Sequence, residues 1–179
     1  MKVCIICNSD NLTEIVEKNL VKYYCSSCKQ KSSRYLDRGR IKKINTNYGI
    51  KHQVVKAIIK NGKGQILFIK RRTYPFGITI PAGHIDNGET SREALDREVF
   101  EETGLRVKKA KLFFKEVDVK NSCRAGADYH DWFAYECETQ GTVMENYEID
   151  SVFWSPPEEG PNISPRNKTI FEAYINYGK

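Results

Sequence analysis

Three glutamates, Glu98, Glu101 and Glu102, are spaced so that a helix would bring their carboxylates together. At 3.6 residues per turn they fall within an arc of about 100° on the helix surface. Such a stripe is usually a solvated acidic face with Lys or Arg partners, but the close basic residue here is Arg97 alone. Crowded carboxylates suit a hard divalent cation such as Mg²⁺ or Mn²⁺, which prefers oxygen ligands. The spacing therefore predicts a divalent-cation site on a helix.

The glutamates belong to a longer motif. Its order is Gly83, five residues, Glu89, seven residues, and then Arg97–Leu105 with the sequence Arg-Glu-Val-Phe-Glu-Glu-Thr-Gly-Leu. This matches the Nudix box, G-x5-E-x7-R-E-U-x-E-E-x-G-U, at every defined position. Residues 48–179 therefore resemble a Nudix hydrolase domain. The resemblance implies an α/β fold, an α/β/α sandwich with a mixed sheet, and hydrolysis of a nucleoside diphosphate linked to another moiety.

The resemblance also implies a role for each residue of the box. The expected ligands of the Mg²⁺ or Mn²⁺ ions are Gly83 through its carbonyl, Glu89 through water, Glu98, Glu101 and Glu102. Arg97 is expected to hold a glutamate of the box in position. Many family members activate the attacking water with the first glutamate of the run, here Glu98. Others use a glutamate outside the box, for which Glu145 and Glu148 are the candidates, and Glu148 is included among the catalytic residues.

Four of the six cysteines form two CxxC pairs, Cys4 with Cys7 and Cys25 with Cys28. Two such knuckles supply the four thiolates of a tetrahedral structural Zn²⁺ site. Disulfides are the first alternative, but they are rare in the reducing compartment expected of a chain without an export signal. A redox dithiol is the second, although one CxxC would suffice for it. We predict a small zinc-ribbon domain over residues 1–32, similar to those in front of some nucleotide hydrolases.

Positive charge is concentrated in the first fifty residues. Met1–Ile50 contains ten Lys and Arg residues against four Asp and Glu residues, whereas the rest of the chain contains nineteen of each. The excess favours an anionic partner, nucleic acid above all, although a solvated basic linker over residues 33–47 explains it equally well. No apolar run approaches the roughly 20 residues of a membrane helix. We therefore expect a cytoplasmic protein with no membrane partner.

The remaining sequence predicts the elements that position the box. Strands are expected over 52–59 and 65–70, paired as a hairpin through a turn at 61–64. A helix capped by Thr90 or Ser91 should end at Gly104. Further strands and a closing helix are expected over 78–80, 111–119, 129–137, 152–154 and 165–177. The isolated cysteines, Cys123 and Cys137, are expected to be ordinary buried or half-buried thiols.

The sequence indicates the substrate-binding residues less specifically than it indicates the reaction. The candidate substrate-binding residues flank the box and are Arg71, Arg72, Tyr74, Phe76 and Trp132, with Tyr129 and His130 as further possibilities. For each aromatic residue, packing in the core is at least as good an explanation as stacking on a base. His130 fits a structural histidine better than a catalyst.

Three functions remain open at this stage. The first is a nucleotide pyrophosphohydrolase acting on a small nucleotide. The second is an NADH pyrophosphatase-like enzyme or an RNA 5′-cap-removing hydrolase that uses the basic N-terminal segment to hold nucleic acid. NADH pyrophosphatases share a zinc ribbon but carry a Ser-Gln-Pro-Trp-Pro-Phe-Pro run, and nothing like it occurs over 106–140. The third is a nucleotide-sensing module without turnover. A homodimer is left open for each.

Overall fold

The computed structural model describes most of the chain. The residues outside the description are Asn19, 74–75, 119–120, 145–146, 158–160, Asn162, Ser164 and 178–179, together with the side chains of Pro165 and Arg166. In the described part, neither helix combines the length and the hydropathy that a membrane crossing requires.

The chain divides into two compact units that are interleaved along the sequence. Unit 1 comprises Met1–Gln53, His84–Gly88 and Val117–Asp131, and unit 2 comprises Val54–Gly83, Glu89–Glu116 and Trp132–Lys179. Unit 1 thus contains the expected ribbon and connector, and also three segments from within the expected domain at 48–179, namely 48–53, 84–88 and 117–131. No single cut in the sequence separates the two units.

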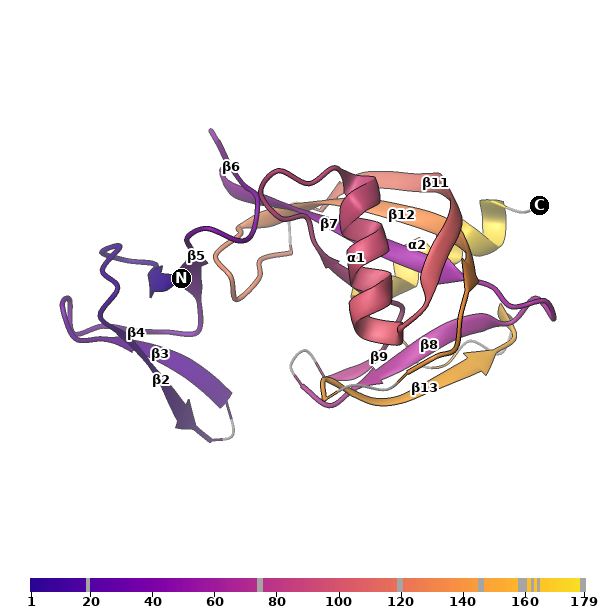
Figure 1. Cartoon of the computed structure of the whole chain (residues 1–179). Coiled ribbons are helices and arrows are strands. Elements are labelled where there is room, and N and C mark those ends of the chain that lie inside the picture. The colour runs from indigo at the N-terminus through magenta and orange to yellow at the C-terminus, as the bar shows by residue number, and fades with distance from the viewer. Residues whose placement is uncertain are drawn as a thin grey trace. The chain divides into compact units, whose positions relative to one another are not determined.

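Short antiparallel strands build the N-terminal part of unit 1 (Figure 1). β1 (Lys2–Cys4) pairs with β5 (Tyr35–Asp37). A second sheet has the order β2-β3-β4, from β2 (Leu12–Glu17), β3 (Leu20–Cys25) and β4 (Lys31–Ser32). β6 (Lys43–Thr46) pairs with the start of β7 (Gly49–Ile59). The expected connector at 33–47 therefore contains β5 and β6 and is structured for part of its length.

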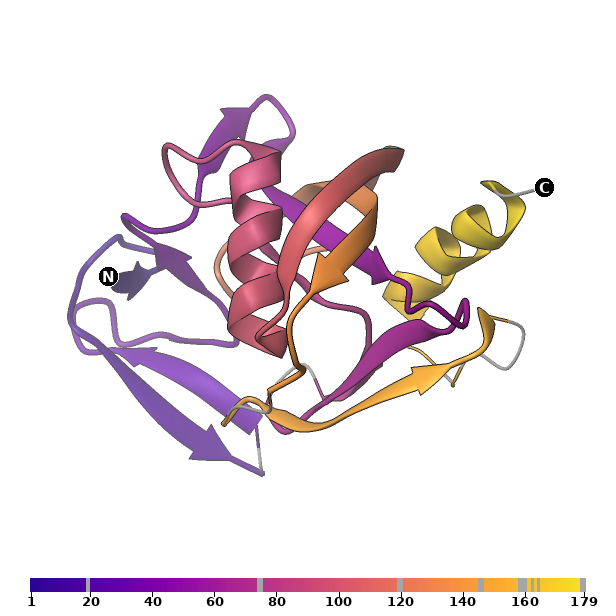
Figure 2. The same cartoon turned by 45° about the vertical axis from the view of Figure 1, so that its right-hand side comes forward.

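Two further sheets carry the rest of the fold. The larger has the order β10-β7-β12-β11, which includes β10 (Ala82–His84), β11 (Arg106–Asp118) and β12 (Tyr129–Gln140). The smaller has the order β13-β8-β9, from β8 (Ile66–Arg71), β9 (Gly77–Thr79) and β13 (Ile149–Ser155). α1 (Ser91–Thr103) lies on one side of the larger sheet and α2 (Pro165–Tyr177) on the other (Figures 1 and 2). The expected α/β sandwich with a mixed sheet is confirmed.

The predicted pairing of the strands at 52–59 and 65–70 is wrong. β7 and β8 lie in different sheets and are joined by one isolated bridge, Lys60 to Ile66. The predicted turn does form, because the Asn61 side chain accepts bonds from the N–H groups of Lys63 and Gln65. The strands then separate for a physical reason. Ile66–Ile69 is fully buried, so β8 needs cover on both faces, which a two-stranded hairpin cannot supply.

A hydrophobic core in unit 2 joins α2 to both sheets. Its large members include Ile58 of β7, Phe68 of β8, and Ile170 and Phe171 of α2. The Phe68 and Phe171 rings pack with their centroids 5.7 Å apart. This core fixes the strands on which the functional side chains are carried.

α1 begins and ends where the sequence predicts. The Thr90 side chain accepts from the Glu93 N–H, and the Glu93 carboxylate accepts from the Thr90 N–H, so the two residues form a capping box. Gly104 ends the helix in the left-handed conformation, with φ 73°. Leu95 and Val99 are buried against the fold, Glu102 is buried beside them, and Glu101 lies on the exposed side of the helix.

Replacing Thr90 by alanine should destabilise the protein. Thr90→Ala removes the acceptor for the Glu93 N–H and should lower the free energy of unfolding of unit 2 by about 1 kcal/mol. Urea unfolding followed by circular dichroism measures the change. Thr90→Ser keeps the hydroxyl and is the matched control. Equal stability of the alanine and serine variants would contradict a stabilising cap.

Candidate active site and metal centres

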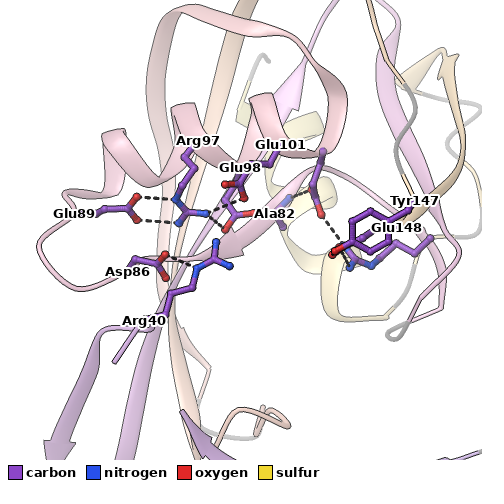
Figure 3. Close-up of polar contacts among 11 residues, drawn as sticks. Arg40, Ala82, Asp86, Glu89, Arg97, Glu98, Glu101, Tyr147 and Glu148 are labelled. Atoms are coloured by element: carbon purple, nitrogen blue, oxygen red, sulfur yellow. Dashed lines mark hydrogen bonds and ion pairs between the residues drawn. The ribbon is translucent and has the colours of Figure 1, made fainter. Parts of the chain in front are cut away.

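The guanidinium group of Arg97 gathers three carboxylates of the box (Figure 3). Nε and Nη2 donate to the two oxygens of Glu89, at 2.7 and 2.9 Å. Nη1 donates to Oε1 of Glu98 at 2.6 Å and to Oε2 of Glu101 at 3.3 Å. A bidentate guanidinium pair of this kind fixes orientation as well as charge. Arg97 therefore sets the direction in which Glu89 and Glu98 present their remaining oxygen atoms.

A second arginine, Arg71, joins the last glutamate of the box to a distant one. Nη1 of Arg71 donates to Oε1 of Glu102 at 2.6 Å, and Nη2 donates to Oε2 of Glu148 at 3.2 Å. The backbone N–H of Ala82 donates to the other oxygen of Glu102 at 2.9 Å. The Tyr147 hydroxyl donates to Oε1 of Glu148 at 2.8 Å. The structure thus brings Glu148, which lies outside the box in sequence, to the same arginine as Glu102 (Figure 3).

Gly83 is required by the position of Glu98. A Cβ atom on Gly83 would lie 1.8 Å from the carboxyl carbon of Glu98 and about as close to both of its oxygens. The backbone of Gly83 does not adopt a positive φ, so the constraint is space rather than conformation. The carboxylate of Glu98 therefore rests directly on the backbone that carries the Gly83 carbonyl.

The three glutamates of the helix have different exposure. The side chains of Glu102, Glu98 and Glu101 are 8%, 14% and 49% exposed. Burial raises the pKa of Glu102 to about 7, against the opposing effects of the Arg71 charge and the Ala82 N–H. A dense set of partly buried carboxylate oxygens suits a hard divalent cation, and the Glu98 carboxylate lies against the backbone of Gly83, whose carbonyl is a further oxygen donor. The donor set therefore fits Mg²⁺ or Mn²⁺.

The predicted substrate-binding residues do not form one group. Arg71 lies among the carboxylates, whereas the Arg72 guanidinium lies 4.0 Å from Asp150. Phe76 is exposed, and Trp132 lies in the hydrophobic core. Tyr74 and the candidate base Glu145 lie outside the described residues.

One polar residue near Trp132 was missed by the sequence analysis. Lys56 is only 6% exposed, and its ammonium group lies 4.3 Å from the centroid of the Trp132 ring. It also donates to the side chain of Asn167. The sequence could have indicated this residue, because Lys56 lies between Val55 and Ala57 in an apolar strand. A lysine is almost never buried without a partner.

The four paired cysteines converge in unit 1. The sulfur atoms of Cys4 and Cys28 lie 3.7 Å apart, and those of Cys7 and Cys25 lie 3.6 Å apart. Sulfur atoms bound to one tetrahedral Zn²⁺ ion are expected about 3.8 Å apart. All six cysteines are free, so the disulfide alternative is wrong for this structure. The cluster fits zinc.

The two isolated cysteines behave differently. Cys137 is buried, as expected, and its thiol bonds to the Tyr135 carbonyl. The expectation that Cys123 is isolated is wrong, because its thiol lies among three histidines. His130 follows Cys123 closely in the sequence, but His52 and His84 lie 71 and 39 residues before it, so no local spacing indicates the whole cluster.

Comparisons with known proteins agree with this geometry. A family model described as the NUDIX domain matches residues 50–174. A protein named NAD-capped RNA hydrolase NudC, from Haemophilus influenzae (strain PittEE), is 31% identical over 160 residues, covering 86% of this chain and 58% of that protein. The protein of the same name from Mannheimia succiniciproducens is 28% identical over 163 residues, covering 85% and 59%. The chain thus spans less than two thirds of the length of these relatives.

Solved structures resemble the chain in fold. The MutT protein from Methanosarcina mazei Go1 has a TM-score of 0.62 at 22% identity, covering 72% of this chain and 96% of that one. A MutT NUDIX hydrolase from Burkholderia pseudomallei has a TM-score of 0.60 at 22% identity, covering 69% and 97%.

Adding a methyl group at Gly83 should disturb the cation site. Gly83→Ala would push the Glu98 carboxylate off the backbone and should weaken Mn²⁺ binding at least ~10-fold, the cost of roughly one lost charged contact. The electron paramagnetic resonance signal of free Mn²⁺ measures binding. Gly62→Ala is the matched control, because nothing lies within 4 Å of a Cβ at Gly62. Unchanged Mn²⁺ affinity in Gly83→Ala would place the cation elsewhere.

Proposed function

The chain belongs to the Nudix family, and we propose that it is a metal-dependent hydrolase of nucleoside diphosphates linked to a second moiety. The observation that carries the proposal is the gathering of Glu89, Glu98 and Glu101 by Arg97, beside the Arg71-bound Glu102. A catalytic cation site needs carboxylates with fixed orientations. They bind the cation and leave its other coordination positions open for phosphate oxygens.

Five groups of the box would hold Mg²⁺ or Mn²⁺: the Gly83 carbonyl, Glu89 through water, Glu98, Glu101 and Glu102. A divalent ion held there would offset the charge of the diphosphate and stabilise the leaving phosphate. Arg97 is a positioning residue, because it orients Glu89 and Glu98 before substrate arrives.

The attacking water needs a carboxylate to orient it and accept its proton. Glu98 and Glu148 are the two candidates. Glu148 is 39% exposed, so water reaches it, and Arg71 and Tyr147 hold its carboxylate in place. Glu98 is 14% exposed and lies against Gly83. The proton would move to a carboxylate oxygen, and the chemistry requires no covalent bond to the protein.

An NAD-type diphosphate, free or at the 5′ end of RNA, is the favoured substrate class, although the chain lacks the Ser-Gln-Pro-Trp-Pro-Phe-Pro run of NADH pyrophosphatases. Two relatives named NAD-capped RNA hydrolase match 86% and 85% of this chain. These matches are longer than the NUDIX domain at residues 50–174, so the similarity extends into the basic N-terminal part. Within this proposal the base or nicotinamide end would meet Arg72 and Phe76, the two exposed candidates, whereas Trp132 is buried in the core. A sensing module without turnover is disfavoured because every acidic residue of the box is present.

Removing one carboxylate should abolish turnover. Glu101→Gln keeps the size of the side chain and removes its charge, and we expect kcat to fall by at least about 100-fold, or roughly 3 kcal/mol in the barrier. The assay screens NADH, ADP-ribose, dinucleoside polyphosphates, deoxynucleoside triphosphates and NAD-capped RNA with Mg²⁺ or Mn²⁺. Asp96→Asn, which breaks an exposed pair with Arg92 on the same helix, is the control and should change kcat less than about 2-fold. A fully active Glu101→Gln enzyme would contradict the proposal.

A role of the basic N-terminal segment in RNA binding should show in the salt dependence. If Lys42 and Lys43 contact phosphates, cleavage of NAD-capped RNA should weaken as salt rises, and Lys42→Gln with Lys43→Gln should reduce the salt slope by about 2. Cleavage of free NADH should be unaffected. The control pair is Lys108→Gln with Lys109→Gln, two exposed lysines of β11. Equal salt slopes for the wild type and both pairs would exclude RNA contact by Lys42 and Lys43.

A further inference from the structure

Three histidines and a cysteine converge in unit 1, apart from the ribbon cysteines. One ligand atom from each of His52, His84, Cys123 and His130 lies within 4.8 Å of all the others. His52 lies on β7, His84 ends β10, Cys123 precedes β12 and His130 lies on β12. Four strong metal-binding side chains are thus brought together by the fold of a single unit.

The separations within this cluster match those of ligands on one ion. The sulfur of Cys123 lies 3.7 Å from Nδ1 of His52 and 3.8 Å from Nε2 of His84. A sulfur and a nitrogen bound to one tetrahedral Zn²⁺ ion, at about 2.3 and 2.05 Å from it, are expected about 3.6 Å apart. The cluster is as tight as the ribbon cysteines, whose sulfur atoms lie 3.6 and 3.7 Å apart.

A second contact prepares His130 for metal binding. Nδ1 of His130 lies 2.5 Å from the backbone carbonyl of Asn121. A carbonyl oxygen can only accept, so Nδ1 carries the proton and Nε2 carries the lone pair that a metal uses. Metal-bound histidines commonly donate their other N–H to a backbone carbonyl in this way, which fixes the ring orientation.

The loop that carries Cys123 is held in place by other residues of unit 1. Arg34 donates to the Cys123 carbonyl at 3.2 Å and to the carbonyls of Gly126 and Ala127 at 2.8 Å each. It also pairs with Asp128 at 2.9 Å. The thiol therefore does not depend on the histidines for its position, and the four donors are preorganised.

The environment of the cluster favours an ion over a network of hydrogen bonds alone. His52 is 1% exposed and His130 is 3% exposed, so two imidazoles are withdrawn from water next to a third. The ring centroids of the three histidines lie 5.3, 5.7 and 6.1 Å apart. The buried larger aliphatic side chains described in unit 1 are Val3, Leu36 and Ile85, a small core that metal binding would reinforce.

We propose that His52, His84, Cys123 and His130 bind a second, structural Zn²⁺ ion. Three imidazoles and one thiolate form a closed tetrahedral set with borderline-soft donors, which suits zinc and leaves no position open for substrate. The site is independent of the proposed hydrolysis. It fixes the backbone at His84, the residue that follows Gly83 in the chain.

Zinc content of the untagged, full-length protein tests the site. Inductively coupled plasma mass spectrometry should find about two zinc ions per chain, one for each cluster. Cys123→Ser and His52→Gln should each lower the content by about one, whereas Cys137→Ser, the control at a buried cysteine outside both clusters, should leave it unchanged. An unchanged zinc content in Cys123→Ser overturns the proposal. Iron or copper in place of zinc overturns the identity of the ion.

X-ray absorption at the zinc edge gives a test on the wild-type protein, which is needed if the variants do not fold. With both clusters filled, the average zinc ion should have about 2.5 sulfur and about 1.5 nitrogen ligands. An all-sulfur first shell would mean that only the ribbon cysteines bind zinc, and the proposal would fail. Neither measurement involves turnover, so its outcome is separate from that of the hydrolase assays.

Discussion

Electrostatic repulsion among carboxylates is the constraint on which the active site depends. Glu89, Glu98 and Glu101 share the guanidinium group of Arg97, and Glu102 and Glu148 share that of Arg71. Without these arginines, the acids packed against the backbone at Gly83 would repel one another and turn toward water. The two guanidinium groups hold the acids close together and fix the angles of their carboxylates, as the proposed cation site requires. Three other features support this arrangement. The capped helix α1 carries the glutamates, Gly83 leaves space for the Glu98 carboxylate, and the buried strand β8 carries Arg71.

The features that depend on residues close together in the sequence were predicted correctly. The interval between Thr90 and Gly104 predicted α1, and the interval between the glutamates predicted that they share a face of it. The CxxC pairs predicted the sulfur cluster for the same reason, since each pair needs only one turn of chain. In these cases the partners are a few residues apart, so the sequence contains nearly all the relevant information.

Long-range contacts were beyond prediction from one sequence. The sharing of Arg71 by Glu102 and Glu148 depends on β8 and β13 being neighbours, and nothing in either segment indicates that pairing. The hairpin prediction for β7 and β8 failed because the turn signal at Asn61 is local, whereas the choice of sheet depends on burial of both faces of β8. Cys123 was assigned to an ordinary thiol because two of its histidine neighbours, His52 and His84, lie on strands far from it in the sequence.

The three segments of unit 1 limit which parts of the chain can be removed or grafted onto another protein. Arg34, in the N-terminal part, is bonded to the loop at 123–128, and Gly126 packs so closely on Leu36 that a Cβ would lie 2.7 Å from that side chain. Arg34 and Leu36, which follow the expected ribbon, are therefore packed into the same unit as the loop at 123–128. Excising residues 1–47 would expose the loop surface that packs against Arg34 and Leu36, and grafting these residues onto another member of the family would require a matching loop.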